Sequence, residues 1–524
     1  MADPWSSIAV QVLADHEIHL FLTMDGVTLA GPEIGLGRLA EAANGSGCLP
    51  SDQHAALSGR YRHTAVWERA AGDAAPDFHP HVAALAAGAR DRVAAVWTLG
   101  QQARRLVGSA DLYPDDAPAA ARVRKRLELV FSKAADARLR SHGLVPRPLQ
   151  VTIDRVTLHA FSTGRSILHA IVRLDADDGS PLGAIELLEA QVALGRFEWL
   201  AWSSAPERRF GLAALLRMLV LGADAAARPA DRVATHTYVQ LEAPATVEDA
   251  DRLGTHLARH YTTDYALLPD AGGVARVRAF ATVGHVVALE GAATVVCPDA
   301  ATGTLAPFLE GFRTTTFRGH YVPIGLLARH EHAFLVDCTA RAVATSDEGE
   351  GAVERLGRLR SESLAFRLFF RFSEISGVTM HNAVNRAFRE VLGLDRMLDE
   401  LADDIVEVEA HLRLVEERRV HHRYYWAGLV GGAALAGLTT FTILKEGGPP
   451  LVGLLGKLMD VPLGKVADPV ESWAKLAGVG LGLLVAGITV WLGLKRKPQG
   501  GPEHRDHDLA QHALIEHMLL AAKK

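Results

Sequence analysis

The sequence predicts a mixed α/β (or α+β) cytoplasmic domain, a long coiled-coil-like stalk helix and a two-helix C-terminal transmembrane hairpin. Three observations lead to this fold class. β-rich runs alternate with helical runs as far as residue 345, an apolar heptad repeat follows from residue 380, and two uncharged runs lie near the C-terminus. These patterns indicate layers of sheet and helix, a helix packed along another helix, and membrane spans, respectively.

Length and composition limit the possible classes of function. A chain of 524 residues is long enough for more than one domain. The net charge of -6 gives no sign of a nucleic-acid partner. Cys48, Cys297 and Cys338 are too few and too scattered for a disulfide framework or a thiolate metal site, which fits a reducing cytosol. The N-terminus shows no cleavable signal sequence.

Residues 1–148 are predicted to form a helix-rich α/β region. We expect two strands between Ser7 and Ala30 around a turn at Asp25-Gly26, and mostly Ala-rich helix over residues 50–142. The glycine-rich segment from Gly31 to Gly37 matches neither the dinucleotide fingerprint nor the P-loop spacing, so it predicts an ordinary turn.

Residues 149–345 are predicted to form a mixed α/β domain. A β-hairpin is expected over residues 150–174, because two β-rich runs flank Ser162-Thr163-Gly164. Further expected helices cover about 181–193, 209–224 and 247–261, and expected strands cover 233–242, 277–283, 285–289 and 294–297. The run from Leu305 to Thr345 is predicted to be helical.

The stalk is predicted over residues 346–423. Apolar residues recur with a 4-3 spacing from Met380 to Val415, which predicts one uninterrupted helix from Met380 into the first span, with Gly393 as its weak point. One interpretation is a stalk that associates with identical copies, and the other is a buried helix of the soluble domain. The residues assigned to the self-association stripe are Leu394, Leu398, Leu401, Ile405, Val408 and Leu412.

The transmembrane hairpin is predicted over residues 424–494. Uncharged runs of 21 and 19 residues, at 424–444 and 476–494, are each long enough to cross about 30 Å of hydrocarbon as a helix. Arginines before the first run and the basic residues 495–497 place both termini in the cytoplasm. We therefore expect a multi-pass protein of the bacterial inner (plasma) membrane, with residues 495–524 as a cytoplasmic tail.

The 24 histidines include few spacings that suggest a metal site. His256 and His260 have the i, i+4 spacing of a two-histidine metal face, but no carboxylate ligand follows them. His504, His507, His512 and His517 alternate with acidic residues in the tail, where transient metal capture is an alternative to a solvated segment. We find no nucleophile elbow or other enzyme motif and expect no enzymatic activity.

Acidic residues dominate the stalk. Such a run is either the solvated face of a helix or, in an oligomer, a set of carboxylates that binds divalent metal between subunits. The candidate ligands are Asp403, Asp404 and Glu407. The spans offer small and hydroxyl residues, and the candidates for lining a pore are Gly428, Gly432, Thr439, Thr440, Gly447 and Gly448.

This layout resembles the CorA-type divalent cation transporter family. The stretch from Phe370 to Ser376 and Leu392-Gly-Leu-Asp395 are similar to the pre-stalk region of CorA-like proteins. The resemblance implies a homopentamer in the lipid bilayer, with the first span lining a pore for a divalent cation (Mg²⁺ or similar). The family's Gly-Met-Asn signature is missing, because Lys445-Glu-Gly-Gly-Pro-Pro450 follows the first span.

Two hypotheses of function follow. The first is a CorA-like oligomeric channel or transporter that conducts cations and is gated by its cytoplasmic domain. The second is a membrane-anchored sensor or effector whose α/β domain binds a ligand or partner, with the hairpin serving only as an anchor. A tethered enzyme without a recognisable motif is a third alternative.

Overall fold

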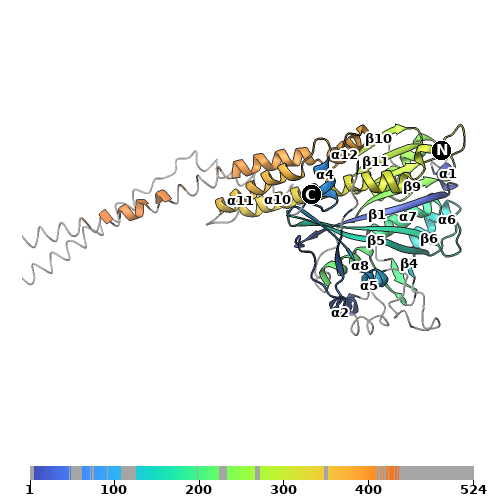
Figure 1. Ribbon diagram of the computed structural model, residues 1–524, viewed down its shortest axis with the longest axis horizontal. Coiled ribbons are helices and arrows are strands. Elements are labelled where there is room, and N and C mark those ends of the chain that lie inside the picture. Colours follow the sequence, from blue (N-terminus) through green and yellow to red (C-terminus); the bar gives the residue numbers. More distant parts are fainter. Residues whose placement is uncertain are drawn as a thin grey trace, which may run out of the picture. The chain divides into compact units, whose positions relative to one another are not determined.

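The computed structural model describes residues 5–46, 48, 62–70, 72, 76–90, 92–107, 126–196, 199–203, 205–222, 233–265, 272–346 and 352–408, together with short runs and single residues from 410 to 435. The chain divides into two compact units, Met1–Val408 and Glu409–Lys524. The first unit contains every helix and strand named below (Figure 1).

One large mixed sheet organises the first unit. Its main strand order is β10-β11-β12-β9-β1-β6-β5-β4-β7-β8, and the short strands β2 and β3 continue from β5. Strand β12 pairs in parallel with β9, whereas the other pairings are antiparallel. The regions predicted separately as 1–148 and 149–345 therefore share one sheet, because β1 lies between β9 and β6.

The N-terminal half alternates long strands with short helices. The central hairpin β5–β6 confirms the predicted hairpin, with a tight turn at Gly164. The expected pair of strands before Ala30 is instead one long strand, β1. The elements are α1 (Ser6–Ala9), β1 (Leu13–Asp25), α2 (Leu36–Ser46), β2 (Trp67–Ala70), α4 (Pro80–Ala86), β3 (Ala94–Leu99), α5 (Gln101–Val107), β4 (Leu127–Leu129), α6 (Lys133–Ser141), β5 (Leu149–Phe161) and β6 (Arg165–Ala176).

The C-terminal half adds the remaining strands and then only helices. The expected elements between residues 181 and 297 are present within a few residues, except that strand β8 precedes the second helix. The elements are α7 (Ala184–Arg196), β7 (Leu200–Trp202), β8 (Ala205–Phe210), α8 (Leu212–Leu221), β9 (Ala234–Leu241), α9 (Val247–Arg259), β10 (Val274–Phe280), β11 (Val283–Ala288), β12 (Gly291–Val296), η4 (Pro307–Leu309), η5 (Arg313–Tyr321), α10 (Val322–Ser346), α11 (Ala352–Phe370) and α12 (Thr379–Val391).

The two faces of the sheet differ in chemistry. Side chains alternate between faces along a strand, so Ile18, Leu20 and Leu22 of β1 point into one core, which they share with α7, α8 and α9. Glu17 and His19 point to the opposite face, which η5, α10 and α12 cover. The sheet therefore has an apolar face and a face that carries buried polar residues.

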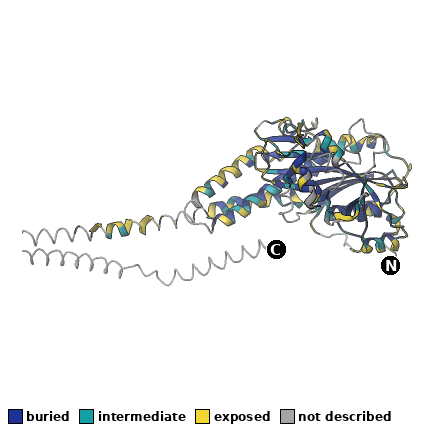
Figure 2. Cartoon of the chain, turned by 90° about the horizontal axis from the view of Figure 1, so that it is seen from below, coloured by how far each residue is buried: buried dark blue, intermediate teal, exposed yellow. Residues whose placement is uncertain are grey.

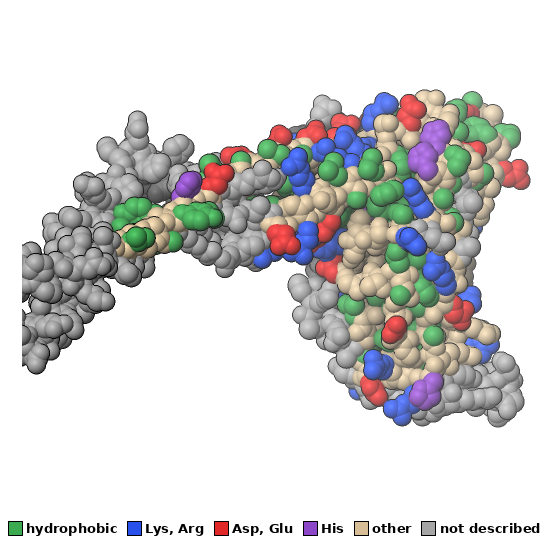
Figure 3. All heavy atoms as spheres, turned by 60° about the vertical axis from the view of Figure 1, so that its left-hand side comes forward, with side chains coloured by type: hydrophobic (Ala, Val, Ile, Leu, Met, Phe, Trp, Pro, Cys, Tyr) green, Lys and Arg blue, Asp and Glu red, His purple; other side chains and the backbone are tan. Residues whose placement is uncertain are grey.

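Helices α10, α11 and α12 lie side by side over that second face and beyond its edge (Figures 1 and 2). Their inward sides are buried and their outward sides are exposed (Figure 2). Arg341 of α10 pairs with Asp337 and with Glu362 of α11. On the face shown in Figure 3, basic and acidic side chains are interspersed over these helices.

Within the predicted stalk, residues 371–378 separate α11 from α12. The helix predicted to run without interruption from Met380 is wrong, because α12 ends at Val391. The chain then turns through Gly393, whose φ of +64° lies in the left-handed region that favours glycine. A second helix covers 394–408. The heptad spacing continues through this break, so periodicity alone did not reveal it.

None of the helices among the described residues combines the length and apolar character that crossing a membrane requires. This finding contradicts the predicted two-helix transmembrane hairpin and the predicted multi-pass inner-membrane localisation. The prediction depended on runs without formal charge, which are not sufficient, since a span must also form one continuous apolar helix. Residues 436–524, including the second predicted span and the tail, lie outside the described residues, and the first span is described only in part.

Candidate functional site

The helix η5 is the unusual element of the fold. Its nine residues form a π-helix, a rare conformation that is frequently found at functional sites. Phe317 is fully buried at its centre, against the rings of His19, His236 and Tyr238 on the polar face of the sheet. The chain continues directly into α10 at Val322. Any change in η5 therefore acts on both the sheet and the helical layer.

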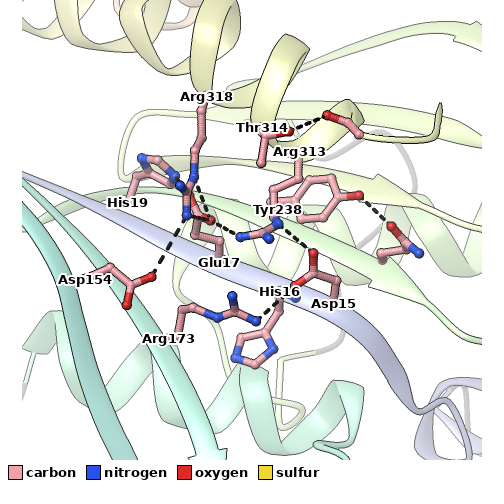
Figure 4. Close-up of polar contacts among 12 residues, drawn as sticks. Asp15, His16, Glu17, His19, Asp154, Arg173, Tyr238, Arg313, Thr314 and Arg318 are labelled. Carbon is pink, nitrogen blue, oxygen red and sulfur yellow. Dashed lines mark hydrogen bonds and ion pairs between the residues drawn. The ribbon is translucent and has the colours of Figure 1, made fainter. Parts of the chain in front are cut away.

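Two arginines of η5 contact a buried carboxylate of β1 (Figure 4). Glu17 is completely buried, and Arg313 Nη1 and Arg318 Nε each donate to it at 2.7 Å. Asp15, also on β1, pairs with Arg313 Nε at 2.6 Å. The fifth member, His19, lies in hydrogen-bond contact with Glu17. We call these five residues the Glu17 cluster.

The charges in the Glu17 cluster are stabilised by their neighbours. Burial alone would raise the pKa of Glu17, but hydrogen bonds from His19, Arg318 and Arg313 outweigh it and hold that pKa well below its ordinary value. The hydrogen bond to Glu17 in turn raises the pKa of Arg318. Burial lowers the pKa of His19. The cluster therefore contains an ionised Glu17, two guanidinium groups and a neutral His19.

A chain of hydrogen bonds extends from the Glu17 cluster across the sheet. His19 Nδ1 lies 2.8 Å from His169 Nε2 on β6, and His169 Nδ1 lies 3.3 Å from Thr157 Oγ1 on β5. Burial lowers the pKa of His169 well below its ordinary value, so both rings are neutral. If His19 donates from Nε2 to Glu17, then His169 donates to His19 and Thr157 donates to His169.

A second cluster lies at the C-terminal end of η5. Asp77, His320 and His381 bring one ligand atom each within 4.8 Å of one another, the only such group of three among the described residues. The rings of His320 and His381 stack with centroids 4.3 Å apart. Both histidines are buried, whereas Asp77 is exposed. We call these three residues the Asp77 site.

Three separate elements place the residues of the Asp77 site. Asp77 precedes α4, His320 belongs to η5, and His381 lies in the first turn of α12. The segment around Phe78 pairs as an isolated β-bridge with Ser376, just before α12. The Phe78 ring lies edge-on to both histidines, at centroid distances of 5.6 and 6.0 Å. A metal ion bound here would connect the N-terminal segment, η5 and α12.

The residues predicted as metal ligands lie elsewhere. Asp403, Asp404 and Glu407 are exposed or half-buried on the helix 394–408 and do not form a group of converging ligands. Burial, reinforced by the neighbouring acids, raises the pKa of Asp404. His256 forms hydrogen bonds with two backbone carbonyls, and His260, which caps the end of α9, forms one with Thr235. Hydrogen bonding within the core therefore explains both histidines.

The predicted self-association stripe is largely buried inside the chain. Four of its members are at most 2% exposed, namely Leu394, Leu398, Leu401 and Ile405. Arg367 of α11 donates to the Leu398 carbonyl, and Arg371 pairs with Asp395. Packing within one chain explains this apolar stripe, and oligomerisation stays a prediction. Val408 is half-buried and Leu412 lies outside the described residues.

The predicted pore-lining residues fall mostly outside the described part of the chain. Gly428 and Gly432 belong to described helical turns, and Thr439, Thr440, Gly447 and Gly448 lie outside the described residues. No family model, no curated protein and no solved structure matches this chain. The resemblance to the CorA-type family and the conduction of cations therefore stay predictions.

Both clusters were missed in the sequence because their members are far apart in it. His320 and His381 are 61 positions apart, and Asp77 lies 243 positions before His320. One signal was present. Glu17 and His19 alternate with the apolar Ile18 and Leu20 in β1, which marks polar positions on a covered face.

Proposed function

We propose that this protein is a ligand-binding sensor in which η5 transmits a binding event from the α/β domain to the helices that follow it. The observation that carries this proposal is the position of η5. Arg313 and Arg318 join it to β1 through Glu17, and His320 and Tyr321 join it to α12 through their contacts with His381.

The proposal is supported by the conformation of η5. A π-helix holds more residues per turn than an α-helix, so conversion between the two would rotate every side chain beyond the point of change. The proposal assigns η5 two discrete arrangements, the π-helix of this structure and an α-helix, because coupling between distant sites requires an element of this kind. The Glu17 cluster holds one arrangement through charged hydrogen bonds, and its arginines are partly exposed.

A second buried ion pair connects α12 to α10 and to the helix 394–408. Arg389 of α12 donates to Glu331 of α10 at 2.8 Å and to Asp395 at 2.6 Å. Asp395 belongs to the helix 394–408, which ends the first unit. A displacement of α12 against α10 would therefore be passed to the helix that leads into the second unit.

Hydrogen–deuterium exchange of the full-length protein tests this proposal. We expect Glu17→Gln, which keeps the side-chain size but removes the charge, to increase exchange in α12 as well as in β1 and η5. A loss of about 1.4 kcal/mol in local stability increases exchange about tenfold. Asp178→Asn is the control, because Asp178 pairs with Arg147 at an exposed position.

The proposal predicts a change confined to the connected elements. Faster exchange in α12 with unchanged exchange in α6 and α9 supports transmission. A Glu17→Gln protein in which only β1 and η5 exchange faster would contradict it, because η5 would then be fixed independently of α12. If Glu17→Gln unfolds the whole protein, Arg313→Lys is measured in its place. This substitution keeps the positive charge but loses the two-point contact with Asp15 and Glu17.

A further inference from the structure

We infer that Asp77, His320 and His381 bind a divalent first-row transition metal ion of the Zn²⁺, Co²⁺ or Ni²⁺ kind, with one coordination position open to water or a small ligand. This inference deepens the proposed function, because it names the ligand of the sensor. Two imidazoles and one carboxylate suit these ions, whereas Mg²⁺ prefers oxygen ligands and keeps several waters.

The first observation is that the buried ring of His320 lacks hydrogen-bond partners. Its side chain is only 7% exposed, yet neither ring nitrogen has a hydrogen-bond partner. Nε2 lies 3.2 Å from Asp77 Oδ2, but the arrangement does not make a hydrogen bond. A buried polar group without a hydrogen-bond partner destabilises the fold, so its presence requires an explanation. A metal ion between His320 and Asp77 supplies one.

The second observation is the tautomer of His381. Ser376 Oγ donates its hydrogen to the Asp77 carbonyl at 2.6 Å and accepts from the Val378 amide at 3.1 Å. The contact of 3.1 Å between Ser376 Oγ and His381 Nδ1 must then use a hydrogen on Nδ1. Nε2 of His381 is left with the lone pair. Metal-binding histidines are commonly held in this way, by a partner on the other ring nitrogen.

The third observation is the charge and the position of Asp77. Asp77 supplies a carboxylate from an exposed position, where its side chain can adjust. Ligand atoms around a tetrahedral ion lie about 3.4 Å apart, so the group, now within 4.8 Å, needs only a small contraction.

Calorimetric titration of the full-length protein with ZnCl₂, after removal of metal with a chelator, tests the inference. To exclude metal binding by the C-terminal histidines, the reference protein carries His504→Gln, His507→Gln, His512→Gln and His517→Gln together. We expect this reference to bind one equivalent of Zn²⁺ and no Mg²⁺. Co²⁺ should give the visible absorption of a four-coordinate site with nitrogen ligands.

Substitutions in the reference protein assign the site. We expect Asp77→Asn and His320→Gln each to weaken Zn²⁺ binding at least tenfold, and the exposed His63→Gln to leave it unchanged. Ser376→Ala should weaken binding about 10–100-fold, and Ser376→Thr should restore it, because the hydroxyl orients His381. Circular dichroism checks that each variant is folded.

Three outcomes separate the metal site from the proposed function. An unchanged Zn²⁺ affinity in both Asp77→Asn and His320→Gln, or no binding by the reference protein, overturns the metal site and leaves the role of η5 intact. Zn²⁺ binding that depends on these residues without any change of exchange in the helix 394–408 supports the site but contradicts the sensor. Binding accompanied by slower exchange in that helix, which holds none of the three ligands, supports both.

Discussion

At the scale of single residues, the fully buried Glu17 is the anion to which the arginines of the Glu17 cluster bind. Removing a carboxylate from water costs several kcal/mol, and only well-placed partners offset that cost. Glu17 has three partners, Arg313, Arg318 and His19. The Glu17 cluster is therefore costly to break at its carboxylate, because Arg318 would lose its close anion and Arg313 would keep only Asp15.

We predict that Glu17→Gln lowers the free energy of unfolding by about 3 kcal/mol at pH 7. The pKa of Glu17 is lower in the folded protein, so its contribution is present above the ordinary value of 4.5 and is lost as the pH falls below that value. Urea denaturation followed by circular dichroism measures the difference. The exposed pair Arg126–Asp177 provides the control, since Asp177→Asn should change stability by less than about 1 kcal/mol.

At the scale of secondary-structure elements, Gly393 separates α12 from the helix 394–408. The φ of +64° lets the chain turn at the end of α12, and Leu394, the next residue, is fully buried. An L-residue in this conformation is strained by about 1–2 kcal/mol. The break also brings Asp395 next to Arg389, so the turn is part of the connection between α12 and the following helix.

We predict that Gly393→Ala destabilises the first unit by about 1 kcal/mol. Gly357→Ala is the matched control, because Gly357 lies within α11 with open space around its Cα. That control should stabilise the protein by up to about 1 kcal/mol, since alanine favours helix. Thermal unfolding of both variants measures the two effects. Stabilisation by Gly393→Ala would mean that the helix is continuous through this position.

At the scale of the whole molecule, a layer of buried histidines lies between the sheet and the helices. Burial lowers the pKa of His285 and of His330 to about 3, and that of His381 to about 4. In the unfolded chain these groups titrate near 6.5. The unfolded state therefore binds more protons than the folded state below pH 6.5. These histidines do not lower the free energy of unfolding above that pH, and they lower it increasingly as the pH falls toward 4.

We predict a steep loss of stability between pH 6.5 and 4, of up to about 1.4 kcal/mol per pH unit for each of these histidines. Urea midpoints measured across this range test it. His285→Gln should remove one histidine's share of the slope, because His285 is buried against Thr294 and Tyr321. A free energy of unfolding that stays constant from pH 7 to pH 5 would contradict the prediction.

Much of the sheet could be predicted from local patterns, whereas the site could not. The hairpin β5–β6 and strand β9 follow from β-rich runs and turn residues that are adjacent in the sequence. The break at Gly393 was missed because the apolar spacing continues across it. The Asp77 site depends on the bridge between Phe78 and Ser376, and no local pattern in the sequence encodes that pairing.

The most direct test of the proposed function is hydrogen–deuterium exchange in residues 394–408, with and without one equivalent of ZnCl₂. The measurement uses the reference protein without tail histidines and its Asp77→Asn variant. Binding at the C-terminal end of η5 should slow exchange in the helix 394–408 at least tenfold in the reference protein and leave it unchanged in Asp77→Asn. Equal exchange in this helix with Zn²⁺ fully bound would contradict the claim that η5 transmits binding to the helices that follow it.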